Sequence, residues 1–392
     1  MHISSETQQF VLKHQNTDIC SLALQTKKYP TVDMQTAITQ IAGRQIAKEK
    51  VPSWHAIDNI WYPRHLSMEQ CSSELTACYK ASLVQGESFT DLTGGFGIDC
   101  AFLATKFKSV TYVERQEELC EIATHNFPLA GLPYIQIKHE DGVTYLKDMS
   151  PVDCIFIDPA RRNEQGGKIV AIKDCEPDVA ELEELLLEKA KLVMIKLSPM
   201  LDLSQALKEM NHTHEIHIIS INNECKELLL ILSKEVANEI AIHCVNLTSK
   251  EHQYFTFTRE QERDCECAYT EHIGNFLYEP NASILKAGAF RLLTSVYPLK
   301  KLHPNSHLYT SDEAIEQFPG RTFRITGQCS FNKKEIKELL GDIKKANITI
   351  RNFPATVADL RKRIKLNEGG DIYLFATTLS NEQKLLIRCE KI

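Results

Sequence analysis

The stretch Phe89-Thr-Asp91-Leu-Thr93-Gly94-Gly95-Phe96-Gly97-Ile-Asp99 decides the fold of this chain. Its apolar start predicts a buried strand that ends in Asp91, followed by a glycine turn and a helix that begins near Ile98. Glycines in such a turn let the backbone approach a ligand without interference from a Cβ atom. This order of elements indicates a parallel α/β sheet that binds a nucleotide-like ligand at the turn.

The residues from 88 to about 235 continue this alternation of strands and helices, which predicts a doubly wound sheet with helices on both faces. The strands at 215–221 and 228–233 follow each other without a helix between them, so we expect an antiparallel edge strand. The predicted strands are 88–92, 110–114, 134–138, 152–158, 192–197, 215–221 and 228–233.

Three other segments accompany this sheet. The first, 1–87, is predicted to be helical, with one helix capped by Asp33 and another that begins at the capping box Ser67-x-x-Gln70. After residue 236 the alternation stops, and the pattern predicts two small α+β domains, with helices expected at 282–294 and 333–346. The expected domains are therefore 1–87, 88–235, 236–319 and 320–392.

Composition narrows the function classes. The 392 residues are 43% hydrophobic and 25% charged, as in soluble globular proteins of several domains. We find no signal-peptide pattern and no membrane-spanning apolar run, so we expect a cytoplasmic protein. The 13 cysteines are scattered, and Cys265 and Cys267 have no further ligands at zinc spacing. We therefore expect no metal site.

Charge is distributed unevenly along the chain. The net charge is −7, but residues 320–392 contain 15 Lys and Arg against 8 Asp and Glu. Such an asymmetry suggests a basic module with an anionic partner. The positive side chains gather in two predicted helices, one with Lys333, Lys334 and Lys337 and the other with Arg361, Lys362, Arg363 and Lys365. Solvated helix faces are the alternative interpretation.

The glycine turn favours S-adenosylmethionine over a dinucleotide. Cys100 replaces the third glycine of a dinucleotide motif, and Asp91 precedes the turn, where a carboxylate attracts the methionine ammonium. NAD is the alternative ligand. The cofactor-binding residues expected at this turn are Asp91, Thr93, Gly94, Gly95 and Gly97.

Two later strand ends are expected to complete the cofactor site. Glu114 closes the second strand, where a carboxylate accepts the ribose hydroxyls, and we assign Arg115 to the same site. Asp141 and Gly142 follow the third strand. Asp141 either meets the adenine amino group or caps the next helix, and one residue can do both.

The fourth and fifth strand ends are where a substrate should react. Asp158 is placed to orient a nucleophile or accept its proton, and Arg161 and Arg162 to hold a phosphate or pair with acidic neighbours. Lys196 and Ser198 are placed to contact substrate, although Ser198 and Asp202 also suit helix capping. The predicted catalytic residues are Asp158, Arg161 and Lys196, and Asp158 is assigned to the cofactor site as well.

With these residues placed, the chain resembles a bacterial family of class I methyltransferases with a C-terminal THUMP-like domain. The resemblance runs from about residue 41 to the end. It rests on Gln70-Cys-Ser-Ser73-Glu74-Leu-Thr76, Asp91–Asp99, Asp158-Pro-Ala-Arg-Arg162, Lys196-Leu-Ser-Pro199, Leu277-Tyr-Glu-Pro280-Asn-Ala-Ser-Ile and Leu308-Tyr-Thr-Ser311-Asp312.

This resemblance implies a Rossmann-like class I methyltransferase sheet, a ferredoxin-like domain at 236–319 and a THUMP-like domain at 320–392. It also implies an S-adenosylmethionine-dependent enzyme that methylates RNA, either tRNA or rRNA. A small-molecule methyltransferase and a noncatalytic RNA-binding protein are the alternatives. Two departures from common motifs stand out: Thr93 replaces the first glycine of the turn, and Asp158-Pro-Ala-Arg161 lacks the aromatic residue that supports a flipped base.

Overall fold

The computed structural model describes residues 3–161, 171–235, 238–249 and 251–392. The chain forms two compact units. The first consists of Met1–His214 and Leu229–Val236, and the second of Glu215–Leu228 and Ala237–Ile392.

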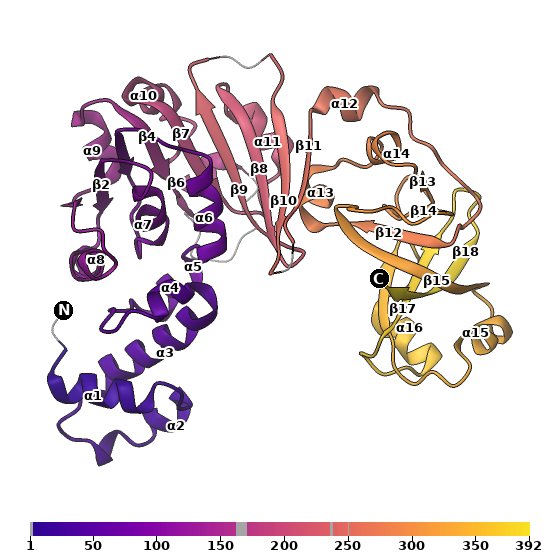
Figure 1. Cartoon of the computed structure of the whole chain (residues 1–392), viewed down its shortest axis with the longest axis horizontal. Coiled ribbons are helices and arrows are strands. Elements are labelled where there is room, and N and C mark those ends of the chain that lie inside the picture. The colour runs from indigo at the N-terminus through magenta and orange to yellow at the C-terminus, as the bar shows by residue number, and fades with distance from the viewer. Residues whose placement is uncertain (1–2, 162–170, 236–237, 250) are drawn as a thin grey trace. The chain divides into compact units, whose positions relative to one another are not determined.

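The first unit contains the expected parallel sheet, with the strand order β3-β2-β1-β4-β7 (Figure 1). Its strands are β1 (Ser88–Asp91), β2 (Ser109–Glu114), β3 (Ile135–His139), β4 (Val152–Ile157) and β7 (Ala190–Leu197). Strand β1 pairs in parallel with both β2 and β4. The chain order therefore reverses beside β1, which places the glycine turn in the crevice where such sheets bind ligands.

Helices connect these strands and lie on both faces of the sheet (Figure 1). They are α7 (Ile98–Ala104), α8 (Glu117–Leu129), α9 (Gly142–Asp148), α10 (Glu183–Lys189) and α11 (Leu203–Glu209). The α/β fold class predicted from the sequence is confirmed. A short antiparallel pair, β5 (Ala160–Arg161) with β6 (Cys175–Glu176), follows β4, and the one-turn helix η2 (Ile172–Asp174) precedes β6.

The N-terminal segment is helical, as predicted, and packs on the sheet domain. Asp33 accepts the backbone N–H of Thr36 and caps α3. Trp54 meets Phe96 of the glycine turn edge to face, with the ring centroids 5.2 Å apart. The elements are α1 (Ser5–His14), α2 (Ile19–Ala23), η1 (Thr26–Lys28), α3 (Met34–Lys50), α4 (Pro52–His55), α5 (His65–Gln70) and α6 (Glu74–Ser82).

The predicted capping box at Ser67 is wrong. Ser67 lies inside α5, which ends at Gln70, and Cys71 is extended. The next helix, α6, is capped by Ser73, whose side chain accepts the backbone N–H of Thr76. The break at Cys71 therefore makes two helices of the segment in which the sequence pattern indicated one.

Strands β8 (Thr213–Ile221) and β9 (Glu224–Ser233) follow each other directly, as the sequence predicted. Asn222 and Asn223 join them with φ of 48° and 68°, and a two-residue turn of this kind is typical of antiparallel hairpins. In the second unit, β10 (Ala241–Leu247) pairs in parallel with β8, and β11 (Gln253–Phe257) pairs antiparallel with β10. The antiparallel edge strand is therefore β11, and not the strand at 228–233 that we expected to form this edge.

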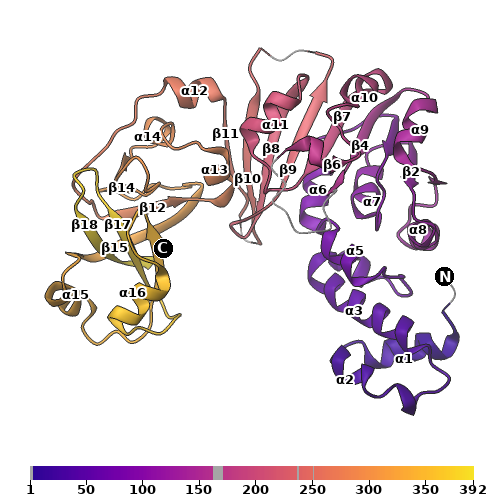
Figure 2. The same ribbon diagram turned by 180° about the vertical axis from the view of Figure 1, so that it is seen from behind.

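The rest of the second unit contains a seven-stranded sheet in the order β13-β14-β12-β15-β18-β17-β16. Figure 2, seen from behind, labels its strands β12, β14, β15, β17 and β18. Its strands are β12 (Phe276–Pro280), β13 (Lys300–Lys301), β14 (Tyr309–Ser311), β15 (Gly320–Ser330), β16 (Asn347–Arg351), β17 (Ile372–Thr378) and β18 (Lys384–Lys391). The helices are α12 (Arg259–Asp264), α13 (Ala282–Ala287), α14 (Leu293–Val296), α15 (Lys333–Leu340) and α16 (Val357–Ile364). Residues from both predicted α+β segments thus share one sheet, and its core includes Leu277, Phe323 and Phe375.

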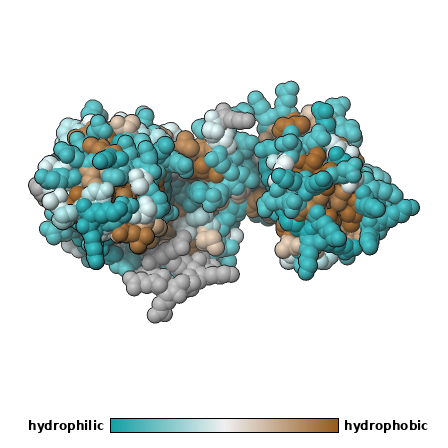
Figure 3. Space-filling model, turned by 90° about the horizontal axis from the view of Figure 1, so that it is seen from below, coloured by the Kyte–Doolittle hydropathy of each residue, from teal (hydrophilic) through white to brown (hydrophobic). Residues whose placement is uncertain are grey.

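No helix in the described parts of the chain is long and apolar enough to cross a membrane. Hydrophilic side chains cover most of the face shown in Figure 3, with apolar side chains in scattered patches.

Candidate active site

Asp91 ends β1, and its side chain is buried. Its Oδ1 accepts the backbone N–H of Thr93 at 3.0 Å, whereas the buried Oδ2 has no hydrogen-bond partner among the described residues. Burial raises the pKa of Asp91 well above its usual range; the hydrogen bond from Thr93 opposes this effect, and the charge of Asp99 adds to it. A buried carboxyl with an unused oxygen destabilises the fold, so its position indicates a binding role.

Thr93 has a defined structural role at the position of the missing glycine. Its Oγ1 accepts the backbone N–H of Asp158 at 2.7 Å. Because β1 and β4 are neighbouring strands, this bond joins the two strand ends that border the crevice. The threonine therefore fixes the turn relative to Asp158.

The glycines of the turn meet two different requirements. Gly95 and Gly97 have φ of 56° and 87°, which glycine adopts without strain. Gly94 has an ordinary φ, but a Cβ atom there would lie 2.1 Å from the ring of Tyr112. That buried ring supports the turn, and its hydroxyl donates to the carbonyl oxygen of Gly95 at 2.6 Å.

Glu114 ends β2 with its carboxylate beside the turn. Its two oxygens accept the backbone N–H groups of Gly95 and Gln116, each at 2.8 Å. These bonds hold the carboxylate at the crevice. Arg115 instead forms an ion pair with Glu176 at 3.0 Å, and both side chains are more than half exposed.

Asp141 and Gly142 lie next to the turn after β1. Asp141 caps α9, accepting the backbone N–H groups of Val143 and Thr144 at 3.1 and 3.0 Å. The capping interpretation of Asp141 is therefore confirmed, and its adenine role stays a prediction. A Cβ atom at Gly142 would lie 2.2 Å from the carbonyl oxygen of Leu92, so glycine is needed for this close approach.

A buried charged cluster lies next to these strand ends. Lys80 of α6 has 0% of its surface exposed, and its Nζ lies 2.9 Å from Oδ1 of Asp99 on α7. Ser72 donates its hydroxyl to Oδ2 of Asp99 at 2.7 Å and accepts from Lys80 at 2.9 Å. Burial alone would raise the pKa of Asp99, but Lys80 and Lys196 outweigh it and lower that pKa to about 2. Asp99 is therefore charged at neutral pH.

Lys196 connects the buried cluster to Asp158. Its Nζ lies 3.4 Å from Oδ2 of Asp99 and 2.5 Å from Oδ2 of Asp158. The side chain of Asp158 is 35% exposed, whereas that of Lys196 is 11% exposed. Burial raises the pKa of Asp158, and the charge of Lys196 opposes this. Of these two paired groups, Asp158 is the one that an external substrate can reach more easily.

Sequence reasoning identified Asp158 and Lys196 but missed Ser72, Lys80 and Asp99 as members of the site. Ser72 lies two residues before α6, Lys80 lies in the last turn of that helix, and Asp99 lies in the first turn of α7. Ser72 belongs to a motif that carried the family resemblance, and Asp99 ends the glycine stretch. No spacing rule connects them, because tertiary packing brings them together.

The remaining predicted residues are only partly described. The backbone of Arg161 pairs with Cys175, but its side chain and all of Arg162 lie outside the described residues. The hydroxyl of Ser198 accepts the backbone N–H of Met200 at 3.3 Å. Asp202 caps α11. The capping interpretation is confirmed for Asp202.

Comparisons with known proteins agree with this geometry. The family model of protein-L-isoaspartate(D-aspartate) O-methyltransferase matches residues 34–164. A ferredoxin-like domain model matches 276–319, and a THUMP domain-like model matches 320–391.

Two relatives are informative. A crystal structure from Porphyromonas gingivalis W83, described as a candidate methyltransferase, is 34% identical to this chain with a TM-score of 0.87, and the match covers 98% of this chain and 97% of that one. An uncharacterized RNA methyltransferase of Mycoplasma mobile is 34% identical over 92 residues, which are 23% of this chain and 25% of that protein. The chain thus matches about a quarter of that relative's length.

The parallel sheet, its glycine turn and these matches define the protein as a methyltransferase. The chain belongs to the methyltransferase family that carries a ferredoxin-like domain and a C-terminal THUMP-like domain, because its similarity to the Porphyromonas protein extends over nearly all of both chains. The family resemblance inferred from the sequence motifs is confirmed.

Proposed function

We propose that this protein transfers a methyl group from S-adenosylmethionine to RNA, either tRNA or rRNA. The observation that carries the proposal is a methyltransferase crevice joined in one chain to a basic THUMP-like domain. Residues 320–392 contain 15 Lys and Arg against 8 Asp and Glu in a chain whose net charge is −7. The name of the Mycoplasma relative supports RNA as the substrate. In this proposal, residues 88–235 form the methyltransferase domain, 236–319 the ferredoxin-like domain and 320–392 the THUMP-like domain.

S-adenosylmethionine fits the residues around the turn. The buried Oδ2 of Asp91 lacks a hydrogen-bond partner among the described residues, and the methionine ammonium is a donor of opposite charge. The carboxylate of Glu114, held beside Gly95, can accept ribose hydroxyls. Asp141, next to the same turn, can accept a hydrogen bond from the adenine amino group. When bound, the sulfonium supplies the electrophilic methyl group.

Asp158 is the residue that we assign to the nucleophile. Its partly exposed carboxylate can orient an N–H or O–H group of the substrate and accept a proton from it. Lys196 forms an ion pair with this carboxylate. The backbone N–H of Asp158 donates to the hydroxyl of Thr93, and this bond fixes the distance of Asp158 from the turn. Correct placement of the two reactants then supplies much of the rate enhancement.

The lysines at the start of α15 are the clearest candidates for phosphate contacts. Lys333 and Lys334 are exposed. Two arginines of α16 have structural partners: Arg361 donates to the carbonyl oxygens of Ala346 and Leu366, each at 3.4 Å. The guanidinium of Arg363 lies 4.4 Å from the centroid of the Phe331 ring. Mutations in α15 therefore separate RNA binding from folding better than mutations in α16.

The decisive experiment is methyl transfer to total RNA from a strain that lacks this gene, followed by nucleoside mass spectrometry. We expect one methylated nucleoside with the wild-type protein and none with Asp158→Asn, although that variant should bind S-adenosylmethionine within a few-fold of wild type. The same assay is run in parallel on the small-molecule fraction of that strain. Methylation found only in that fraction would mean that the substrate is a small molecule and not RNA. Cofactor binding without transfer to either fraction would contradict an enzymatic function.

A salt titration tests the basic surface. For each single-stranded phosphate contact, log K falls by about 0.7 per log unit of salt. If both side chains contact phosphates, Lys333→Glu/Lys334→Glu should lower the slope by about 1.4, and acidic residues in a first helical turn do not oppose folding. Lys27→Glu/Lys28→Glu makes the same charge change on exposed residues of the first unit and should keep the wild-type slope. Equal slopes for all three proteins would mean that α15 does not contact RNA.

A further inference from the structure

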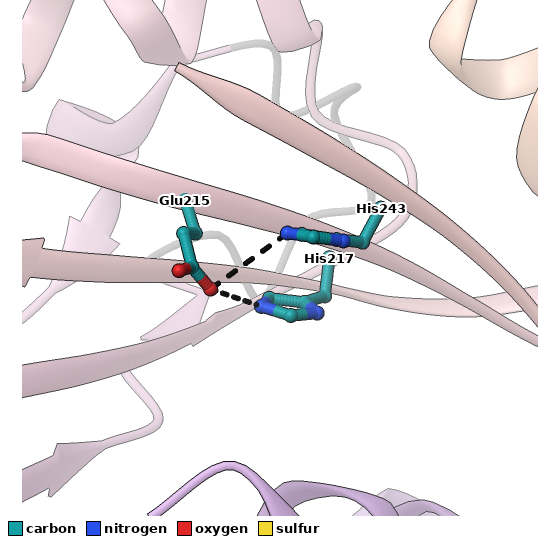
Figure 4. A group of neighbouring side chains, drawn as sticks. All are labelled: Glu215, His217 and His243. Carbon is teal, nitrogen blue, oxygen red and sulfur yellow. Dashed lines mark hydrogen bonds and ion pairs between the residues drawn. The ribbon is translucent and has the colours of Figure 1, made fainter. Parts of the chain in front are cut away.

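One carboxylate and two imidazoles converge in the second unit, outside the residues of the candidate active site. They are Glu215 and His217 on β8 and His243 on β10, shown in Figure 4. Residues two apart in a strand project from the same face, so Glu215 and His217 are neighbours. The parallel register pairs His217 directly with His243. The pairing of β8 with β10 therefore brings the three side chains together.

The possible ligand atoms point toward a common position (Figure 4). Nε2 of His217 lies 3.2 Å from Oε2 of Glu215, and Nε2 of His243 lies 3.8 Å from the same oxygen. The two rings are stacked, with centroids 4.5 Å apart and an interplanar angle of 15°. One ligand atom from each residue lies within 4.8 Å of the others. This arrangement presents two nitrogens and one oxygen to a single cation.

Thr256 on β11 supports His243 from the opposite side. It stands directly across from His243 in the antiparallel register, and its Oγ1 lies 3.0 Å from Nδ1 of that ring. When Nδ1–H donates to Thr256, Nε2 carries the lone pair that a metal requires, and such partners are typical of metal-binding histidines. Nε2 is buried without a hydrogen-bond partner among the described residues.

We propose that Glu215, His217 and His243 bind a divalent transition-metal ion, for which Zn²⁺ is the expected occupant. Zinc binds imidazole nitrogen and carboxylate oxygen at about 2.0–2.2 Å, which in a tetrahedral site separates ligand atoms by about 3.3 Å. The Glu215–His217 distance of 3.2 Å already matches. The ring of His243 must approach Glu215 by about 0.5 Å, and the two nearly parallel rings must tilt so that both nitrogens face one ion. The side chain of Glu215 is 38% exposed, so solvent can supply the remaining ligand. The proposal replaces our expectation of no metal site, which considered the cysteines alone.

Metal titration of the full-length protein tests this site. After removal of metal by a chelator, we expect wild type to bind one Zn²⁺ at the cluster. Glu215→Gln and His243→Ala should each weaken binding at that site by at least about tenfold, because loss of a ligand should cost no less than loss of a residue that only hydrogen-bonds to a ligand. His272→Ala, which removes an exposed histidine of the same unit, should bind like wild type.

Cobalt distinguishes this site from the cysteines. Co²⁺ bound to nitrogen and oxygen ligands shows visible d–d bands without the intense near-ultraviolet band of thiolate ligation. We expect such a spectrum from wild type and its loss in Glu215→Gln, and added Zn²⁺ should raise the thermal unfolding temperature of wild type more than that of Glu215→Gln. Circular dichroism of the metal-free proteins checks folding.

Three outcomes would overturn the proposal: no stoichiometric binding to wild type, equal affinity for wild type and Glu215→Gln, or thiolate ligation of the cobalt. Each would leave the cluster as an ion pair that joins β8 and β10 without a metal. Unfolding of His243→Ala would not remove the test, because Glu215 is partly exposed and its glutamine variant keeps the size of the side chain.

Discussion

Lys80→Met should destabilise the first unit strongly, because it removes the nearest cation of the buried Asp99 carboxylate. The two charges lie 2.9 Å apart, and Lys80 is fully buried. Removing one partner of a buried pair costs about 3–5 kcal/mol. Lys196 at 3.4 Å and Ser72 at 2.7 Å still contact Asp99, so we expect a loss near the lower limit, about 3 kcal/mol.

A second substitution separates charge loss from packing loss. Lys80→Met/Asp99→Leu replaces the pair with apolar side chains, and such replacements of buried ion pairs are often close to neutral. Lys196 keeps Asp158 as its partner at 2.5 Å. We therefore expect the double variant to be more stable than Lys80→Met alone, with a coupling free energy of at least about 2 kcal/mol.

Tryptophan fluorescence during urea unfolding measures these differences. The chain has 2 tryptophans, and both Trp54 and Trp61 belong to the first unit, so the signal reports on that unit. Lys106→Met, which changes an exposed lysine of the same unit, should stay within about 0.5 kcal/mol of wild type. The reasoning fails if Lys80→Met also stays within that range. It also fails if the stability lost by the double variant equals the sum of the losses measured for Lys80→Met and for Asp99→Leu.

Three other substitutions test the residues at the crevice. Glu114→Gln should weaken S-adenosylmethionine binding by about 2–4 kcal/mol in calorimetry, because charged hydrogen bonds contribute about 1.5–3 kcal/mol each. The control Glu117→Gln, on the exposed start of α8, should bind like wild type, and equal affinity of both variants would remove Glu114 from the site. Asp91→Asn should abolish cofactor binding yet stabilise the free protein by about 1–2 kcal/mol at neutral pH. The pKa of Asp91 is raised in the folded state, so its ionisation opposes folding as pH rises. The stability difference between Asp91→Asn and wild type should therefore grow with pH above about 4 and disappear below it. A variant less stable than wild type at pH 7 would contradict this. Gly142→Ala should cost about 1–3 kcal/mol of unfolding free energy, because its Cβ would lie 2.2 Å from the carbonyl oxygen of Leu92, and an unchanged urea midpoint would show that the turn can move aside.

The sequence predicted the catalytic sheet well because its strands are short apolar runs with clear ends. The strand before the glycine turn was expected at 88–92 and is β1, Ser88–Asp91. Helix ends were less predictable. The helix expected at 333–346 stops at Leu340, where Gly341 adopts a φ of 51°, and the one expected at 282–294 is interrupted at Gly288 with a φ of 82°. In both cases a glycine inside an acceptable helical pattern ended the helix.

The candidate site was predictable only where a residue follows a strand. Asp91, Glu114 and Asp158 were identified because the ends of parallel strands meet at one edge of a sheet. The Lys80–Asp99 pair depends on how α6 packs beside α7, and helical periodicity does not reveal a partner on another helix. The Glu215–His217–His243 cluster depends in the same way on strand register, which a single sequence does not specify.

The buried cluster also assigns a role to the N-terminal segment. Ser72 and Lys80, both before residue 88, satisfy the charge of Asp99 from the glycine stretch, and Asp99 in turn contacts Lys196, the partner of Asp158. Without Ser72 and Lys80, Lys196 would be the one partner of Asp99 left among these three residues. Lys196 would then be shared between the carboxylates of Asp99 and Asp158. A buried carboxylate with too little positive charge raises its own pKa and weakens the fold around it. We therefore expect the helices before β1 to help hold Asp158 in position, although the secondary-structure pattern changes at residue 87.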